Sequence, residues 1–180
     1  TLSQAIIVYE KPSIEVISDS VCLGNSNLFF PVLNGGAPTT TPGLEWVWDF
    51  GDGTLSDQAS PIHTYGEAGT YQVSVQVSSV ESCTDSSTIV TEVYALPEAT
   101  INLADHCQGD EAPIQNLSTS VSGAAVTYLW EMGDGSTLTS DDPAYTYDSP
   151  GNYQVFLLAT DENNCSDTVS AAINVLAAPV

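Results

Sequence analysis

The sequence predicts an all-β protein made of two tandem β-sandwich repeats, and three observations carry this prediction. The chain has 180 residues, which is enough for two small domains, each with a modest core. A Trp-x-x-Gly-Asp-Gly motif at Trp48 recurs at Trp130, 82 residues later. Apolar and polar side chains alternate with a period of two in several segments, and no helical period is sustained. A repeated β-sheet unit therefore explains the chain better than a single large domain.

The register of the repeat is constant from the motif onward. Positions shared by the copies recur at an offset of 82, namely Pro61 and Pro143, Tyr65 and Tyr147, Gly69 and Gly151, Tyr71 and Tyr153, Cys83 and Cys165, Asp85 and Asp167. The N-terminal halves align at an offset of 85, which pairs Cys22 with Cys107. The first copy therefore holds three more residues, which we place in the Gly-, Thr- and Pro-rich stretch 34–43.

The chain ends continue the repeated pattern. Val8-Tyr9 before Pro12 resembles Val93-Tyr94 before Pro97. We therefore expect four segments: 1–10 as the last strand of a preceding repeat, 11–95 as the first repeat, 96–177 as the second, and 178–180 as the start of a linker to a next repeat.

Each copy reads as a series of short strands separated by Gly, Pro, Asn and Asp. Tyr71, Val73, Val75 and Val77 alternate with polar neighbours, so one face of this strand should be buried. Further strands are expected around Ile14–Val16, Leu28–Phe30, Leu44–Phe50 and Thr88–Val93. About seven such strands in a repeat of this length indicate an immunoglobulin-like sandwich.

The charge balance excludes several classes of partner. The chain has 23 acidic residues and a single basic one, Lys11, for a formal net charge of −22. Phosphate binding needs clustered Lys and Arg, so nucleic acid is excluded as a direct partner, and so are anionic lipid surfaces. No apolar run is long enough for direct membrane insertion. Ion pairs contribute little to such a fold, and an extracellular location rich in dissolved cations suits it.

These residues resemble the PKD (polycystic kidney disease) domain family. Its signature appears here as Trp48-Asp49-Phe50-Gly51-Asp52-Gly53, His63-Thr64-Tyr65 and Gly69-Thr70-Tyr71-Gln72-Val73. The second copy departs from it at Glu131, Met132 and Tyr145. The additional pair of cysteines in each repeat resembles the version found in large surface adhesins of Bacteroidetes-type bacteria. The resemblance implies two immunoglobulin-like PKD sandwiches and a surface role.

The signature residues have a structural interpretation that requires no catalysis. Large apolar residues anchor a small core, glycines adopt backbone angles that other residues resist, Asp pins the turn, and Tyr forms a tyrosine corner. The residues concerned are Trp48, Gly51, Asp52, Gly53, Tyr71, Trp130, Gly133, Asp134, Gly135 and Tyr153.

The four cysteines predict disulfides. Paired cysteines in a secreted domain usually oxidise, and there is no Cys-x-x-Cys spacing for zinc. One bond inside each repeat is expected, Cys22 with Cys83 and Cys107 with Cys165. In a simple sandwich these positions lie at opposite ends, so a bond between neighbouring repeats, Cys22 to Cys165, stays open as the alternative.

Sequence features for ligands and modification are weaker. Calcium prefers carboxylate and carbonyl oxygens, so Asp161, Glu162 and Asn163 form a candidate calcium loop. The first copy offers the poorer Ser79–Ser82 at that position. Ser20 and Thr168 lie in Asp-Ser/Thr-aliphatic triplets that resemble O-glycosylation sites of Bacteroidetes. No Ser-His-Asp set recurs between the copies, so we expect no enzyme activity and no cofactor other than calcium.

These observations give three candidate functions. The leading expectation is a non-catalytic structural or adhesive segment of a long bacterial surface filament or stalk, extracellular and attached at the cell surface, with neighbouring repeats, surface glycans or proteins as partners. The alternative is an accessory module of a secreted hydrolase that binds polysaccharide or acts as a spacer. The third is a recognition module that reads a protein partner. Carbohydrate modules display exposed aromatic rows, whereas Trp46 and Tyr128 are expected to face the core.

Overall fold

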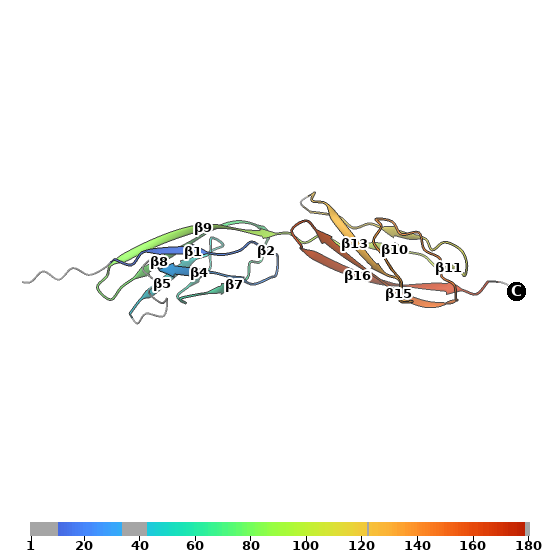
Figure 1. Ribbon diagram of the computed structural model, residues 1–180, viewed down its shortest axis with the longest axis horizontal. Helices are drawn as coiled ribbons and strands as arrows, with labels where there is room; N and C mark the ends of the chain where they lie inside the picture. The colour runs from blue at the N-terminus through green and yellow to red at the C-terminus, as the bar shows by residue number, and fades with distance from the viewer. Residues whose placement is uncertain (1–10, 34–42, 122, 179–180) are drawn as a thin grey trace, which may run out of the picture. The chain divides into compact units, whose positions relative to one another are not determined.

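The computed structural model describes residues 11–33, 43–121 and 123–178. The chain divides into two compact repeats, one ending at Tyr94 and the other beginning at Ala95 (Figure 1). Every regular element in the described ranges is a β-strand, which confirms the predicted all-β class. In the part of the chain that the structure describes, no helix is long and apolar enough to cross a membrane. The predictions for residues 1–10, 34–42 and 179–180 lie outside the described residues.

The first repeat is a sandwich built on one five-stranded sheet. Its strands are β1 (Ile14–Ile17), β2 (Val21–Cys22), β3 (Asn27–Leu28), β4 (Phe30–Leu33), β5 (Glu45–Asp49), β6 (Leu55–Ser56), β7 (Ile62–His63), β8 (Gly69–Ser78) and β9 (Thr84–Tyr94). The sheet has the order β2-β9-β8-β5-β6, and the pairs β1-β4 and β3-β7 complete the fold. The long hairpin of β8 and β9 spans the repeat and determines its length.

Alternation along the central strands produces the core of the first repeat. β5 pairs with β8 so that Trp48 lies opposite Val75. Trp48, Val73 and Val77 have no exposed surface. Other members of this core are Ile14, Phe29, Leu33, Trp46, Phe50, Tyr65 and Val93. The expected inward orientation of Trp46 agrees with its burial.

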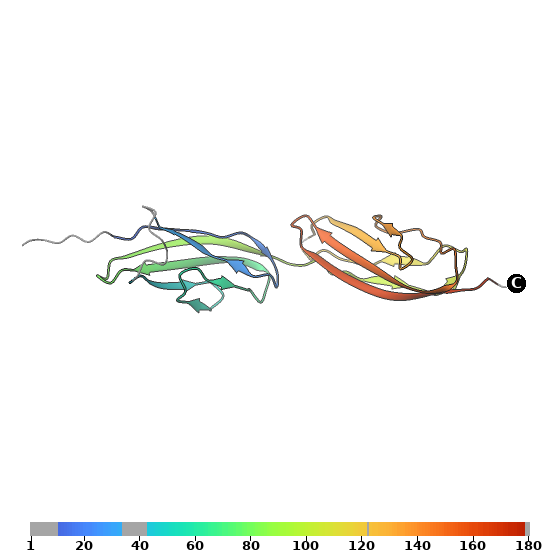
Figure 2. The same ribbon diagram turned by 60° about the horizontal axis from the view of Figure 1, so that its bottom comes forward.

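The second repeat reproduces this arrangement. Its strands are β10 (Ile101–Leu103), β11 (His106–Cys107), β12 (Ile114–Asn116), β13 (Val126–Glu131), β14 (Thr137–Leu138), β15 (Gly151–Asp161) and β16 (Ser166–Leu176). The five-stranded sheet has the order β11-β16-β15-β13-β14, with β10-β12 as a separate pair. Figure 2 shows the hairpin of β15 and β16 spanning the repeat. Trp130, Met132, Tyr147, Val155 and Leu157 are fully buried in its core.

The two ends of each repeat carry different features. The leading end, where the chain begins the repeat, lies beside the hairpin turn: the amide of Ile14 donates to Asp85 Oδ2 at 3.0 Å, and the amide of Ala99 donates to Asp167 Oδ2 at 3.0 Å. The trailing end lies where the last strand finishes. There β2 pairs in parallel with β9, so that Cys22 lies opposite Tyr94 (Figure 1). β11 pairs with β16 in the same way.

Candidate functional site: the signature turn and the sheet face beside it

The signature turn of the first repeat is organised by the carboxylate of Asp52. Its Oδ1 accepts hydrogen bonds from the Thr54 amide at 3.0 Å and the Thr54 hydroxyl at 2.6 Å. Its Oδ2 lies 2.7 Å from His63 Nε2. Partial burial raises the pKa of Asp52, but the hydrogen bonds from Thr54 and His63 outweigh it and hold this pKa below the ordinary 3.8. The carboxylate is therefore fully used in fixing the turn.

The second repeat builds the same turn with a different donor. Asp134 accepts a hydrogen bond from the Ser136 amide at 2.9 Å and from the Tyr145 hydroxyl at 2.5 Å. Burial raises the pKa of Asp134, and the hydrogen bonds from Tyr145 and Ser136 more than reverse that effect. Desolvation and the bond to Asp134 raise the pKa of Tyr145. The hydroxyl is thus held as a hydrogen-bond donor to the turn.

One glycine of each turn is required by close approach of the backbone. Gly51 has φ +80°, and a Cβ at this position would lie 2.6 Å from the carbonyl oxygen of Gln72. Gly133 has φ +81°, and its Cβ would lie 2.6 Å from the carbonyl oxygen of Gln154. A side chain at either position would meet both a disfavoured backbone angle and a rigid neighbour. The turn consequently packs directly against the central hairpin.

The buried aromatic residues have their polar atoms paired with backbone carbonyls. Four such bonds occur, two in each repeat: Trp48 Nε1 to Gln58 O at 2.9 Å, Trp130 Nε1 to Ser140 O at 3.0 Å, Tyr65 Oη to Phe50 O at 3.2 Å, and Tyr147 Oη to Met132 O at 2.9 Å. Burial raises the pKa of both tyrosines. These groups support the fold and are not available for chemistry.

In each repeat, the last tyrosine of the signature donates a hydrogen bond to the backbone carbonyl four residues earlier. Tyr71 donates to the Glu67 carbonyl and Tyr153 to the Ser149 carbonyl, both at 2.9 Å. The ring of Tyr71 also stacks on that of Tyr65 with centroids 4.0 Å apart. This is the geometry of a tyrosine corner. The repeated motif therefore does structural work in both copies.

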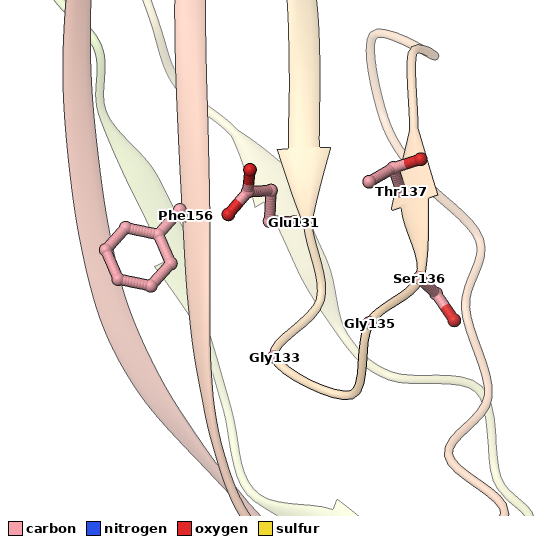
Figure 3. A pocket seen from close by; sticks show the side chains of 6 residues that line it. All are labelled: Glu131, Gly133, Gly135, Ser136, Thr137 and Phe156. Atoms are coloured by element: carbon pink, nitrogen blue, oxygen red, sulfur yellow. The ribbon is translucent and has the colours of Figure 1, made fainter.

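The second repeat has a hollow beside its signature turn that the sequence pattern did not predict. A hollow of about 360 Å³ is lined by Glu131, Gly133, Gly135, Ser136, Thr137 and Phe156 (Figure 3). Glu131 and Phe156 lie opposite each other on β13 and β15. A second hollow of about 250 Å³ continues along the sheet over Leu129, Leu158 and Thr168. Phe156 is 46% exposed and Leu129 is 39% exposed, so this sheet face presents apolar side chains beside Glu131 and Thr168.

The corresponding face of the first repeat lacks this aromatic side chain. The register places Asp49 at the position of Glu131, Ser74 at that of Phe156 and Gln76 at that of Leu158. Phe156, which lines the hollow, is therefore not part of the shared motif.

The cysteines correct the expected disulfide pairing. Cys22 and Cys165 are each disulfide-bonded, whereas Cys83 and Cys107 carry free thiols. Cys22 lies opposite Tyr94, while Cys83 immediately precedes the other end of β9 at Thr84. An 11-residue strand measures roughly 35 Å, far beyond the Cα separation of about 4.4–6.8 Å that a disulfide requires. Cys107 and Cys165 are separated by β16 in the same way. The prediction of one disulfide inside each repeat is therefore wrong.

In the candidate calcium loop, the carboxylate of Asp161 accepts hydrogen bonds from the loop's own backbone. Asp161 is 7% exposed, and its Oδ1 accepts from the amides of Asn163 and Cys165 at 2.9 Å each. Glu162 is exposed. Within residues 11–33, 43–121 and 123–178, no group of three or more His, Cys, Asp or Glu is arranged to hold a metal. Calcium binding stays a prediction, with Asp161 shown to be a cap of the β15–β16 turn.

The serine and the threonine of the two candidate O-glycosylation triplets are exposed, but no other feature of the structure distinguishes them. Ser20 is exposed in the segment between β1 and β2. Thr168 is exposed on β16, at the margin of the apolar hollow. Glycosylation of either residue stays a prediction.

Asp85 and Asp167 have a role that the repeat pattern did not predict. Besides the Ile14 amide, Asp85 binds Lys11 Nζ at 2.8 Å, and these contacts lower the pKa of Asp85. A Cys-x-Asp pattern recurs at both hairpins and was the available signal. Each Asp ties the start of its repeat to its hairpin, so the leading end is a defined structure.

Each repeat is a β-sandwich in which the polar atoms of the signature side chains are hydrogen-bonded within the fold. This arrangement is that of a non-catalytic immunoglobulin-like module. The family profile of the PKD domain matches residues 10–93 and again 94–175. The chain belongs to the PKD domain family, as the signature predicted.

Similar proteins match over part of the chain. The pre-pro-metalloprotease PrtV of Vibrio cholerae is 41% identical over 61 residues, covering 34% of this chain and 7% of that protein. A microbial collagenase of Vibrio alginolyticus is 44% identical over 60 residues, covering 33% of this chain and 7% of the collagenase. The crystal structure of the PKD1 domain from PrtV is similar with a TM-score of 0.40 and 33% identity, covering 45% of this chain and 98% of that domain. The matched segment is thus a small fraction of these proteins.

Proposed function

We propose that this chain is a non-catalytic accessory segment of a secreted hydrolase, in which the two PKD modules act as a spacer between neighbouring domains. One observation carries the proposal: each module receives the chain at its leading end, beside Asp85 or Asp167, and releases it at the far end of its longest strand. A module of this kind adds the length of its hairpin to the distance between whatever precedes and follows it.

The relatives support the accessory role over the expected surface filament. Similar segments occur in a pre-pro-metalloprotease and in a microbial collagenase, where they make up 7% of each protein. In this chain the signature side chains are hydrogen-bonded to backbone or to one another, which supports a structural role for the modules. We therefore place the accessory module ahead of the adhesive stalk.

An extracellular location follows from the same proposal. Disulfides persist in oxidising environments, and Cys22 and Cys165 are oxidised. A net charge of −22 with a single basic residue keeps the chain soluble in a medium that contains screening cations.

Small-angle scattering tests the spacer role. Strands of 11 residues give modules roughly 35 Å long. Two modules in series should have a maximum dimension of about twice that length in physiological salt, whereas two packed side by side would give a markedly smaller one. The smaller value, with an apolar interface between the repeats, would overturn the spacer proposal.

A second candidate function, polysaccharide binding, is favoured by the apolar face of the second repeat. Phe156 offers an exposed ring, and Glu131 beside it offers a carboxylate that accepts hydroxyl hydrogen bonds. Sugar rings combine apolar faces with hydroxyl edges and fit such a surface.

Sedimentation with insoluble cellulose, chitin and collagen separates the two candidates. The spacer proposal expects the chain to remain in the supernatant with all three. A binding module would be depleted, and the variant Phe156→Ser, which copies Ser74 of the first repeat, would abolish depletion. The matched control is Val47→Ser, which removes an exposed apolar side chain from the first repeat.

A further inference from the structure

The second repeat carries an exposed aromatic ring and an exposed carboxylate side by side on its outer sheet face. Phe156 on β15 lies directly opposite Glu131 on β13, so both side chains project from the same face of the sheet. Phe156 is 46% exposed, and Glu131 is exposed as well. Figure 3 shows the Glu131 carboxylate extending from β13 toward β15, the strand that carries the Phe156 ring. Both side chains line the hollow of about 360 Å³.

The fold does not use the carboxylate of Glu131. Among the residues that the structure describes, none donates a hydrogen bond to this carboxylate or forms an ion pair with it. In the first repeat, the corresponding Asp49 accepts a hydrogen bond from the Gly51 amide at 2.9 Å. The hydroxyl of Ser136, at the rim of the hollow, is bonded to the Tyr145 hydroxyl at 2.8 Å. Glu131 is therefore the acceptor in the hollow that is left for a ligand.

The distribution of charge favours a cationic ligand. Glu131 is the only charged residue among those that line the two hollows of this face. The single basic residue of the chain, Lys11, belongs to the first repeat and is paired with Asp85 at 2.8 Å. The second repeat thus has no lysine or arginine of its own for Glu131. A net charge of −22 attracts cations to such a surface and repels a second copy of the chain.

A guanidinium group matches both the ring and the carboxylate. Its planar face stacks on an aromatic ring, and its parallel N–H groups donate a pair of hydrogen bonds to a carboxylate. The ammonium group of lysine is a point charge without a planar face. A neutral sugar would cover the ring and partly desolvate the carboxylate of Glu131 without supplying an opposing charge. Leu129 and Leu158 lie opposite each other beside the ring and extend the apolar surface for a neighbour of the arginine.

We propose that this hollow binds an arginine side chain of a polypeptide partner, in which an apolar residue adjoins the arginine. The guanidinium stacks on Phe156 and donates to Glu131, and the adjoining apolar side chain packs on Leu129. The first repeat, with Ser74 at the position of Phe156, does not present this combination. The inference goes beyond the spacer role and does not depend on it.

The first test titrates the whole chain with peptides that differ in one side chain. The probes are acetyl-Leu-Arg-Leu-amide and its versions with lysine or citrulline at the centre, because citrulline keeps the shape of arginine without its charge. Heteronuclear NMR of the isotope-labelled chain follows the backbone amides. We expect the arginine peptide to shift the amides of Leu129, Glu131 and Phe156, and the citrulline peptide to have a dissociation constant about tenfold higher. Equal affinities of these two peptides, or equal shifts in both repeats, would overturn the proposal.

The second test changes the chain and keeps the arginine peptide. Glu131→Gln removes the charge of the hollow, and Phe156→Ser removes the ring. Each should raise the dissociation constant about threefold. Asp49→Asn is the matched control, because it removes the same charge from the corresponding position of the first repeat and keeps an acceptor oxygen for the Gly51 amide. It should leave the affinity unchanged, and equal effects of Glu131→Gln and Asp49→Asn would show that only the net charge attracts the peptide.

Neutral oligosaccharides separate this proposal from polysaccharide binding at the same residues. Cellohexaose and chitin hexaose are added to the labelled chain under the conditions of the peptide titration. We expect the arginine peptide, and neither sugar, to shift the amides of Glu131 and Phe156. The reverse result would assign the hollow to sugars and contradict the proposal. The spacer role is tested by scattering in the absence of any peptide, so failure of either proposal leaves the result for the other unchanged.

Discussion

The two repeats share one frame and fill it with different side chains. In the first, Asn27 is 2% exposed and donates to Thr91 Oγ1 at 2.9 Å and to the Asp19 carbonyl at 2.8 Å. The register places Ala112 and Ile173 at the positions of Asn27 and Thr91, and both are buried apolar residues. The Thr91 hydroxyl also donates to the Asp19 carbonyl at 3.0 Å, so the first repeat has a small buried hydrogen-bonded group where the second has an apolar pair.

The same comparison holds at the surface of the sandwich. The turn carboxylate is bonded by His63 in one copy and by Tyr145 in the other, so the donor changes while the acceptor stays. The outer sheet face differs as well, with Ser74 in the first repeat at the position of Phe156 in the second. Between the copies, two interior residues change together, the turn keeps its carboxylate while its donor changes, and the outer face differs in polarity.

Removing the central tryptophan should have the largest effect and should act on one repeat at a time. Trp48→Ala and Trp130→Ala each leave a large cavity and an unpaired carbonyl, so the altered repeat should lose about 3–5 kcal/mol. Denaturant titration with the other repeat as internal control measures this. Equal weakening of both repeats by either variant would show that they do not unfold independently.

The buried polar pair should show strong coupling. Asn27→Ala should cost the first repeat about 1–3 kcal/mol, because Thr91 and the Asp19 carbonyl lose a donor. The double variant Asn27→Ala/Thr91→Ile copies the second repeat at these two positions, and because Asn27 and Thr91 bond to each other we expect the two losses to be non-additive, with a coupling of about 0.5–3 kcal/mol. Additive losses in the double-mutant cycle would contradict this coupling.

The two turns should lose stability together at low pH. The pKa values of Asp52 and Asp134 lie below 3.8 in the folded state. Their contribution is therefore complete above about pH 4 and is lost as the pH falls through the lower folded pKa. Asp52→Asn/Asp134→Asn should flatten this part of the stability profile relative to the wild type.

The difference between the two profiles is the quantity to measure, since protonation of other carboxylates also relieves charge repulsion. Circular dichroism during denaturant titration at pH 2.5 to 5 provides it. Identical slopes in the two proteins would show that neither turn carboxylate is linked to folding.

Exchange of the outer residues should have the smallest effect. Phe156→Ser alters an exposed side chain and Ser74→Phe a half-buried one outside the core, so each should change the free energy of unfolding by less than about 0.5 kcal/mol. Thermal denaturation measures this directly. A larger loss in Phe156→Ser would mean that the hollow supports the second repeat rather than presenting a surface.

Much of the fold was predictable from the sequence, because the residues that the fold requires recur at matching positions in the two copies. The period-two pattern at Tyr71–Val77 predicted a central strand, and the structure has β8 there with Val73, Val75 and Val77 buried. Trp48 and Trp130 are buried as predicted. Side-chain alternation and turn residues involve neighbours along the chain, so a single sequence is sufficient to recognise them.

The Asn27–Thr91 pair could not be read in this way. Its members are 64 residues apart, and neither belongs to the shared motif. The apolar face at Phe156 also escaped notice, because it depends on which outer positions of β13, β15 and β16 lie side by side. Such neighbours are determined by strand register across the sheet.

The sequence by itself determined the repeat, its family, its strand pattern and the recurrence of two cysteines in each copy. Only the tertiary structure decided that the two cysteines of the first repeat lie too far apart to bond to each other. The parallel pairing of β2 with the end of β9 carries Cys22 to the trailing end of its repeat, a whole strand away from Cys83. Spacing along the chain gives no measure of that separation, because a strand pairing far from the cysteine motif sets it.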